Sequence, residues 1–254
     1  MKLFYRQSGQ GLPVIILHGL FGSSDNWMSI GKKLSENYKV FLVDQRNHGQ
    51  SENTPEFNYE IMAEDLRDFI EEHKIIQPIV VGHSMGGKVA MKFATKYPEM
   101  LRKLVVVDIA PRAYPVHHQK ILEGLNSINL SSLKSRTDAD MALAQHEPIQ
   151  PVRQFLLKNL YRNSSGAFDW RINLPVITEK IEAVGELIQS DAPVDVPTLF
   201  MGGTNSAYIV ESDHTDIKAI FPKAEIRMIS NAGHWIHAEQ PVKFIEVLNR
   251  FIAG

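Results

Sequence analysis

The stretch PIVVGHSMGGKVA at residues 78–90 constrains the fold of this chain more than any other feature. A β-branched run leads almost without a loop into a helical pattern, and the G-x-S-x-G pattern of Gly82, Ser84 and Gly86 stands between them. Such a junction predicts a strand that turns at once into a helix, with a strained serine and glycine where side chains would clash. The serine oxygen then projects above a sheet edge, beside the positive end of the helix. We therefore predict a nucleophilic Ser84; the alternative is an ordinary strand–turn–helix junction with an incidental serine.

The rest of the chain repeats this strand-then-helix order. Short apolar runs alternate with helical patterns, which is typical of a mainly parallel sheet covered by helices on both faces. Residues 2–7 are expected to add an edge strand. The other predicted strands are 14–17, 40–43, 79–81, 104–107, 198–201 and 226–229, and the clearest predicted helices are 59–73, 85–97 and 241–252.

Residues 112–192 interrupt this alternation. They contain no convincing strand, and they are too many for a loop between two strands of one sheet. We expect a helical cap over one edge of the sheet, inserted into an α/β core made of residues 1–111 and 193–254. The predicted helices of the cap are 116–128, 137–146, 150–161 and 175–190, with prolines between them.

A nucleophilic serine needs a base within hydrogen-bond reach. His234 follows the last predicted strand in the small-residue loop SNAGHW, from which it can lean over the sheet edge toward Ser84. His237 is the rival, but it is expected in the following turn, so we predict that His234 is the base. His83 is expected to pack or bond locally. The histidines expected to be solvated are His117, His118, His146 and His214.

The acid that orients the histidine is harder to place. The stretch LFMGGTNSAYI at residues 199–209 offers only Asn205, which carries no charge. Asp108 ends the apolar run after the serine helix, so its strand should lie beside the serine strand and reach the same edge. An ionisable group closing such a strand is costly without a partner. We predict Asp108 as the acid, with Asn205 and Ser206 in hydrogen-bonding support; the alternative is an aspartate that caps the strand end or the entry to the cap.

The other acids near this part of the chain are less well placed. Glu211 and Asp213 are expected in a surface loop or at the start of a helix, and Asp191 and Asp195 precede the strand at its wrong end.

The turn His18-Gly19 ends the first central strand. We expect the backbone N–H groups of Leu20 and Met85 to form an oxyanion hole, and the His18 ring to brace the loop. Three aromatic residues, Phe21, Trp27 and Trp235, could line an acyl pocket or equally belong to the core. We expect Lys88 to be solvated or paired, and we expect Asp44, Arg46 and Asn47 to fix a loop.

Composition excludes several classes of partner and site. Lys plus Arg number 27 and Asp plus Glu 29, a net charge of −2 without a basic stripe, so we expect no nucleic-acid partner. The chain has no cysteine, which excludes disulfides, a thiol nucleophile and thiolate metal sites. No apolar run approaches the roughly 20 residues that span a bilayer, and the N-terminus reads as a strand and not as a signal peptide. We expect a cytoplasmic protein.

Five segments carry a resemblance to a known family: HGLFGSSDNW at 18–27, VDQRNHGQS at 43–51, VGHSMGGK at 81–88, VVVDIAP at 105–111 and NAGHW at 231–235. Together they resemble the α/β-hydrolase superfamily of serine hydrolases, and the RNHG and GHSMGGK segments look most like its YbfF-like esterase branch. The resemblance implies an α/β-hydrolase fold, hydrolysis of acyl esters, including thioesters in some members, and no metal or organic cofactor. It also implies an acid at Asp108.

We therefore expect a carboxylesterase that cleaves short- to medium-chain acyl esters, or thioesters, with a Ser-His-Asp triad of Ser84, His234 and Asp108. The same triad could serve a carbon–carbon bond hydrolase, a lyase or an amidase. A non-catalytic ligand receptor on the same fold is the alternative from another class, and the complete set of serine, histidine and acid argues against it.

Overall fold

A computed structural model describes all 254 residues. Its main sheet has seven strands in the order β1-β3-β2-β4-β5-β8-β9 and is parallel except for β1, which pairs antiparallel with β3. The predicted mainly parallel sheet and its edge strand are thereby confirmed. The strands are β1 Tyr5–Ser8, β2 Pro13–Leu17, β3 Lys39–Val43, β4 Ile79–His83, β5 Lys103–Val107, β8 Thr198–Gly203 and β9 Ala224–Ile229.

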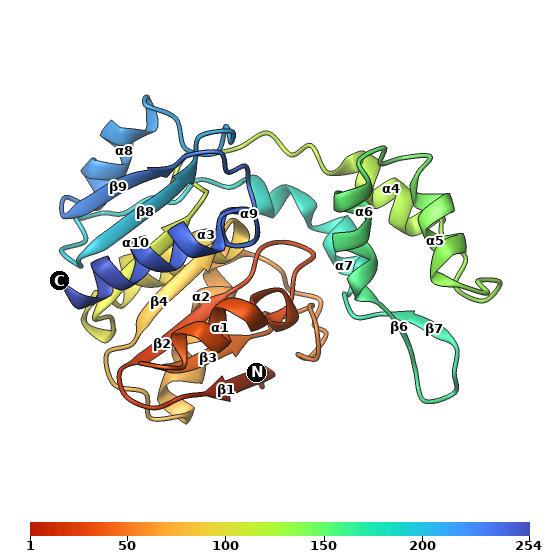
Figure 1. Cartoon of the computed structure of the whole chain (residues 1–254), viewed down its shortest axis with the longest axis horizontal. Coiled ribbons are helices and arrows are strands. Elements are labelled where there is room, and N and C mark those ends of the chain that lie inside the picture. The colour runs from red at the N-terminus through yellow and green to blue at the C-terminus, as the bar shows by residue number, and fades with distance from the viewer.

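Helices cover both faces of this sheet (Figure 1). The helices α1 (Met28–Leu34) and α10 (Pro241–Ala253) pack on one face, and α2 (Tyr59–Glu72), α3 (Met85–Lys96) and α8 (Asp213–Ile220) pack on the other. Strands β4 and β5 are therefore covered on both sides, which is why their sequences are continuous apolar runs instead of alternating ones. Short elements complete this part of the chain: η1 Ser24–Trp27, η2 Pro98–Met100 and α9 Ile236–Glu239.

Residues 112–192, called the cap below, lie beyond the ends of the strands at the right of Figure 1. The cap contains α4 Gln119–Ser127, α5 Arg136–Leu143, α6 Gln150–Leu156, η3 Leu157–Asn159, β6 Leu160–Arg162, β7 Phe168–Trp170, α7 Leu174–Glu179 and η4 Ile181–Gly185. The expectation of no strand in this region was wrong, because β6 and β7 pair as an antiparallel hairpin. Strands of three residues are too short to show an alternating pattern in the sequence.

The side chain of Lys88 ties the cap to the core. Contrary to the expectation of a solvated or paired lysine, it is fully buried, and burial lowers its pKa to about 7. Its Nζ donates to the carbonyl oxygens of Pro111 at 2.9 Å, Arg112 at 2.6 Å and Glu186 at 2.8 Å. These carbonyls belong to the two segments that connect core and cap, called the neck below. Lys88, one helical turn after Ser84, therefore bonds both segments of the neck.

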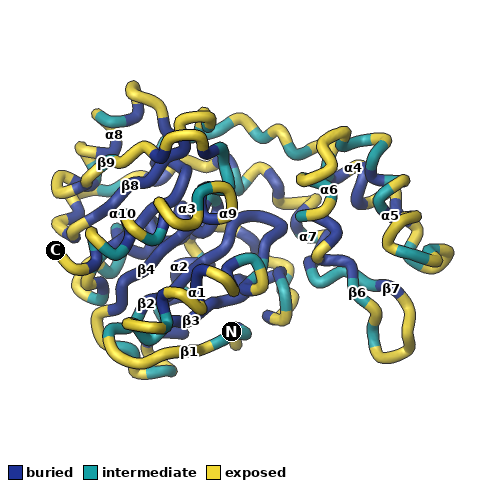
Figure 2. The backbone as a smooth tube through the Cα atoms, viewed as in Figure 1, coloured by how far each residue is buried: buried dark blue, intermediate teal, exposed yellow.

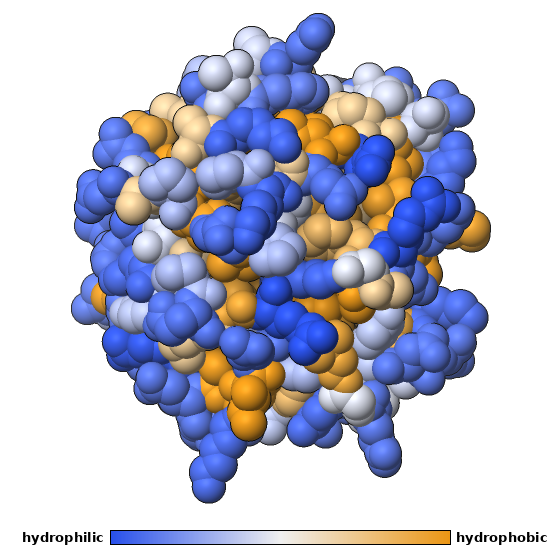
Figure 3. Space-filling model, turned by 90° about the vertical axis from the view of Figure 1, so that its left-hand side faces the viewer, coloured by the Kyte–Doolittle hydropathy of each residue, from blue (hydrophilic) through white to orange (hydrophobic).

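Burial differs between the two parts of the molecule. The inner strands of the main sheet are buried almost throughout, whereas the edge strands β1 and β9 and the cap show more half-buried and exposed chain (Figure 2). The side of the molecule away from the cap is mostly hydrophilic, with apolar groups between charged side chains (Figure 3). None of the helices is long and apolar enough to cross a membrane.

Candidate active site

Ser84 stands between the last residue of β4 and the first residue of α3, with a backbone φ of +52°. A Cβ on Gly82 would lie 2.1 Å from the Gly86 carbonyl oxygen, and a Cβ on Gly86 would lie 2.6 Å from the Leu17 carbonyl oxygen. Only glycine fits at both positions, so the chain can make this abrupt turn. The predicted strained junction is present, and it aims the serine at the sheet edge.

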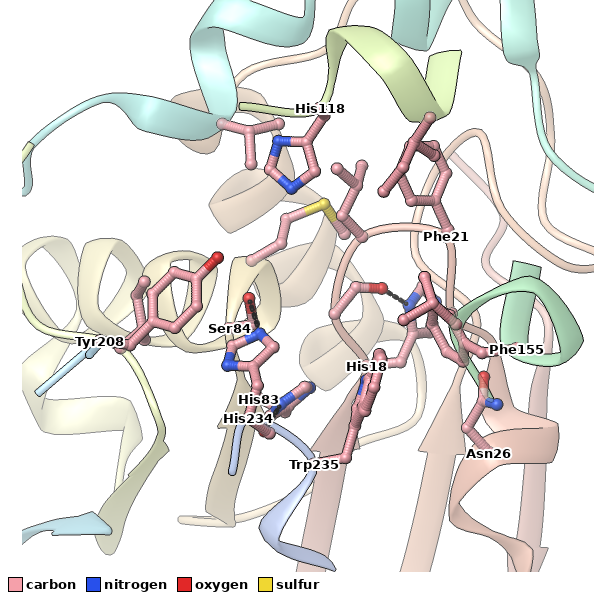
Figure 4. Close-up of a pocket in the computed structure, with 18 of the residues that line it drawn as sticks. His18, Phe21, Asn26, His83, Ser84, His118, Phe155, Tyr208, His234 and Trp235 are labelled. Carbon is pink, nitrogen blue, oxygen red and sulfur yellow. Dashed lines mark hydrogen bonds between the residues drawn. The ribbon is translucent and has the colours of Figure 1, made fainter. Parts of the chain in front are cut away.

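The three residues predicted to form the triad lie in one hydrogen-bonded line, and Figure 4 shows its bond between Ser84 and His234. The Ser84 Oγ is 3.0 Å from His234 Nε2, and His234 Nδ1 is 2.7 Å from Asp108 Oδ2. Asp108 is fully buried directly after β5, which lies beside β4. The rival His237 instead stacks on Trp27, with ring centroids 3.9 Å apart. This geometry can transfer a proton from serine to histidine beside a fixed carboxylate.

The stretch at 199–209 surrounds the Asp108 carboxylate without adding a charge. The Gly203 N–H donates to Oδ1 at 3.0 Å, and the Ser206 hydroxyl donates to Oδ2 at 2.5 Å. Asn205 is exposed, and its backbone N–H donates to the Ala232 carbonyl. Of the two predicted supporting residues, only Ser206 therefore reaches the carboxylate.

Two residues hold His234 from the side, and neither role was predicted. His83 packs against the rings of Trp27 and His237, as one of its two expectations had it, but its Nε2 donates to the distant His234 carbonyl oxygen at 2.8 Å instead of bonding locally. Burial lowers the pKa of His83 well below its usual value, which keeps its ring neutral. Tyr208 stacks on the His234 imidazole with centroids 4.2 Å apart. The β8–α8 loop that carries Tyr208 gives no sequence signal for this contact.

The loop after β2 lies against the serine. A Cβ on Gly19 would be 3.3 Å from the Ser84 Cβ, and Leu20 and Met85 border the same cavity as Ser84. His18 braces this loop as expected, because its Nδ1 lies 2.8 Å from the Gly19 carbonyl oxygen and its Nε2 accepts the Gln45 N–H at 3.0 Å. Burial lowers the pKa of His18 to about 4, so its ring stays neutral near pH 7.

The residues after β3 fix their own loop, as predicted. Arg46 donates to both carboxylate oxygens of Asp65, at 2.6 and 2.7 Å, and Asp44 accepts the backbone N–H groups of Ser24 and Gln50. Asn47 accepts the Thr54 N–H at 2.8 Å. These contacts are structural and leave the side chains away from Ser84.

A cavity of about 380 Å³ opens above Ser84, and 16 of its 31 lining residues are hydrophobic, so an uncharged chain fits it. Phe21, Trp27 and Trp235 all border the cavity, as proposed from the sequence, and Trp27 also packs in the core, with 1% of its surface exposed. His118 also borders it and is not solvated as expected; burial lowers its pKa to about 4. The cap supplies much of the wall, including Ile121, Val152, Phe155, Leu156 and Val184.

Comparison with known proteins places this geometry in a family. A family model described as the alpha/beta hydrolase fold matches residues 13–241. A Danio rerio protein named sn-1-specific diacylglycerol lipase ABHD11 is 38% identical, over 96% of this chain and 79% of that protein. Escherichia coli (strain K12) Esterase YbfF is 36% identical, over 94% of this chain and 92% of that protein. A solved structure described as a marine microorganism esterase is 43% identical with a TM-score of 0.96, and the match covers 98% and 99% of the two chains.

The chain therefore belongs to the α/β-hydrolase family. The relatives named as esterases or a lipase match it over most of both chains, which confirms the predicted esterase branch and the predicted class, a carboxylic ester hydrolase.

Proposed function

We propose that this protein is a carboxylesterase that cleaves short- to medium-chain acyl esters through a covalent acyl-enzyme on Ser84. The observation that carries the proposal is the continuous hydrogen-bonded line from the Ser84 hydroxyl through His234 to the buried Asp108. In this line a neutral imidazole can accept the serine proton, and a fixed carboxylate stabilises the imidazolium that forms.

The proposed reaction has two steps that use the same groups. His234 Nε2 accepts the Ser84 proton as the Oγ attacks the ester carbonyl carbon, and the backbone N–H groups of Leu20 and Met85 donate to the oxyanion. The intermediate collapses, and His234 returns the proton to the departing alcohol. Water, activated by His234, then attacks the acyl-serine and releases the acid.

The cavity supports the proposed substrate class. Its cap wall is apolar and aromatic, and Trp235 and Phe155 lie with ring centroids 5.4 Å apart along it. Apolar walls of this kind favour an uncharged acyl chain, with each buried methylene contributing about 0.8 kcal/mol. The same wall would accept the acyl part of a thioester.

The first experiment compares the wild type with Ser84→Ala on p-nitrophenyl butyrate. We expect the variant to lose turnover by several orders of magnitude, because no other group can form the acyl-enzyme. Undiminished turnover by Ser84→Ala would overturn the proposal.

A substrate panel separates ester hydrolysis from the other reactions that the triad could perform. Esters, thioesters and anilides of one acyl chain vary only the leaving group, and a series of esters varies only the acyl length. We expect the butyrate or hexanoate ester to be cleaved with the highest kcat/KM. A clear preference for anilides, or no cleavage of any acyl ester, contradicts the proposed function.

A further inference from the structure

Phe21 has a backbone conformation that its sequence does not favour. Its φ is +59°, in the left-handed region, although its side chain is large and buried. Such a conformation persists only where surrounding bonds hold it. Phe21 directly follows Leu20, and both residues border the cavity above Ser84 (Figure 4).

A chain of hydrogen-bonded peptide groups connects Phe21 to the Leu20 N–H. The cap residue Asn159 donates from Nδ2 to the Phe21 carbonyl oxygen at 2.7 Å. The Phe21 carbonyl shares its peptide group with the N–H of Gly22, and this N–H donates to the Gly19 carbonyl oxygen at 2.9 Å. The carbonyl of Gly19 and the N–H of Leu20 belong to one planar peptide and point in opposite directions. Fixing the carbonyl therefore aims the Leu20 N–H, which donates to no acceptor in the protein.

Asn159 is itself held firmly within the cap. It is 3% exposed, its Nδ2 also donates to the Leu156 carbonyl oxygen at 3.1 Å, and its backbone carbonyl accepts the Arg171 N–H at 2.8 Å. Both neighbours of the side-chain nitrogen are carbonyl oxygens, so the amide group must present its NH2 to them. A rigid part of the cap therefore reaches the core loop.

The core residue His48 bonds the backbone N–H of Phe21. Its Nδ1 lies 2.9 Å from the Arg46 carbonyl oxygen, so this nitrogen carries the proton and Nε2 is free to accept the Phe21 N–H at 3.3 Å. Burial lowers the pKa of His48 to about 3, which keeps the acceptor available near neutral pH. Phe21 is thus held by the core at its N–H and by the cap at its carbonyl.

We propose that Asn159 is a positioning residue for the oxyanion hole: the core residue His18 also bonds the Gly19 carbonyl, and the bond from Asn159 to Phe21 completes the aim of the Leu20 N–H while the cap lies closed on the core. This inference rests on the proposed function, in which the Leu20 N–H donates to the oxyanion. It makes the cap part of the catalytic arrangement, in addition to its part in the walls of the cavity.

The test uses two variants and a matched control. Asn159→Ala removes the donor, and Asn159→Asp keeps the shape but sets a carboxylate oxygen against the Phe21 carbonyl. The control is Asn126→Ala, because Asn126 is a cap asparagine that bonds only within the cap, to Leu122 and Thr178. We measure kcat and KM on p-nitrophenyl butyrate and the inhibition constant of a propyl trifluoromethyl ketone, whose adduct with Ser84 places an oxyanion in the hole.

We expect both Asn159 variants to lower kcat by about 10- to 100-fold, less than the roughly 10²- to 10³-fold loss when a donor itself is removed. KM should change by less than about twofold, and the inhibition constant should rise by the same factor as kcat/KM falls. Asn126→Ala should match the wild type.

The outcomes separate this inference from the proposed function. An inactive wild type, or an active Ser84→Ala, overturns the proposed function itself. A wild type that hydrolyses the ester, with Asn159 variants that keep kcat and the inhibition constant or that change only KM, overturns the positioning role alone. Asn159→Asp decides the question if Asn159→Ala does not fold.

Discussion

The sheet edge and the cap both border the cavity above Ser84, but different contacts hold them in place. Ser84 and Asp108 each directly follow a strand of the buried parallel sheet, so the register of β4 and β5 fixes their separation. The cap has no strand in that sheet. It is attached through the neck, through Lys88, through a short backbone bridge between Ile172 and His48, and through side-chain bonds such as that of Asn159.

This difference suggests that the sheet edge and the cap have different roles in the proposed reaction. Groups fixed by backbone register carry the chemistry, because small displacements there cost large factors in rate. Under the proposed function, groups on the cap contact the acyl chain and are expected to select it. Changes at the sheet edge should therefore alter kcat for every substrate, and changes in the cap should alter selectivity. Asn159 is the exception, because it lies in the cap but its loss should lower kcat.

The largest expected effect is at the sheet edge. Asp108→Asn should lower kcat by about 10³- to 10⁴-fold on esters of any acyl length, because the imidazolium loses its fixed negative partner. Asn205→Ala should stay within about threefold of the wild type, since the Asn205 side chain is exposed and bonds no group of the site. Steady-state kinetics on p-nitrophenyl esters measure both. The reverse ranking would show that Asp108 is not the acid.

A smaller and selective effect is expected in the cap. Ile121→Trp fills the apolar part of the cavity, and it should lower kcat/KM for an octanoate ester at least about tenfold while acetate changes by less than about twofold. Ile149→Trp is the control, because Ile149 is on the cap and 57% exposed. An equal loss on both esters would show that the cap does not select acyl length.

The neck should open when its buried cation is removed. Lys88→Met deletes three hydrogen bonds to backbone carbonyls, each worth at least about 0.5–1.5 kcal/mol, so the Tyr114 and Ile188 amides, which bond across the neck, should exchange hydrogen at least about tenfold faster. Amides of β4 should change much less. Lys92→Met, one turn further along α3, is the control. Uniform acceleration through the whole chain would mean that Lys88 stabilises the fold in general and not the neck.

The smallest expected effect concerns pH. Burial lowers the pKa of His237 to about 3, against about 6.5 in an unfolded chain. Between these values the unfolded chain binds a proton that the folded chain does not. The free energy of unfolding therefore falls as pH falls from 6.5, by about 1.4 kcal/mol per pH unit for each such histidine.

His237→Phe tests this dependence. Phenylalanine can keep the stacking on Trp27, and the buried Nδ1 that it removes has no hydrogen-bond partner. In urea unfolding between pH 6.5 and 5, the variant should lose stability less steeply than the wild type, by the equivalent of about one proton. Equal slopes would show that folding does not lower the pKa of His237.

Sequence patterns predicted the groups at the carboxyl ends of the strands. Ser84, Asp108 and His234 follow apolar runs, and parallel strands bring their carboxyl ends to one edge, so strand order alone placed these residues together. The cap was less predictable. Its hairpin strands have three residues each, too few for a period, and its division from the core at residues 112 and 192 stays a prediction.

The positioning contacts were not predictable, for a physical reason. His83 bonds a residue 151 positions away, and Lys88 and Asn159 bond carbonyls 98 and 138 positions away. His83 meets its partner only when the core has folded, and Lys88 and Asn159 bond these distant carbonyls only after the cap and core have packed. Their local sequence contains no period or turn signal that could indicate such a contact.

The most direct measurement is the detection of the covalent intermediate. The wild type is mixed rapidly with p-nitrophenyl butyrate, quenched in acid, digested and analysed by mass spectrometry. A butyryl group on the peptide that contains Ser84, absent from Ser84→Ala and formed far more slowly in Asp108→Asn, is the predicted result. Ester turnover with no acyl group on Ser84 under these conditions would contradict the proposed mechanism.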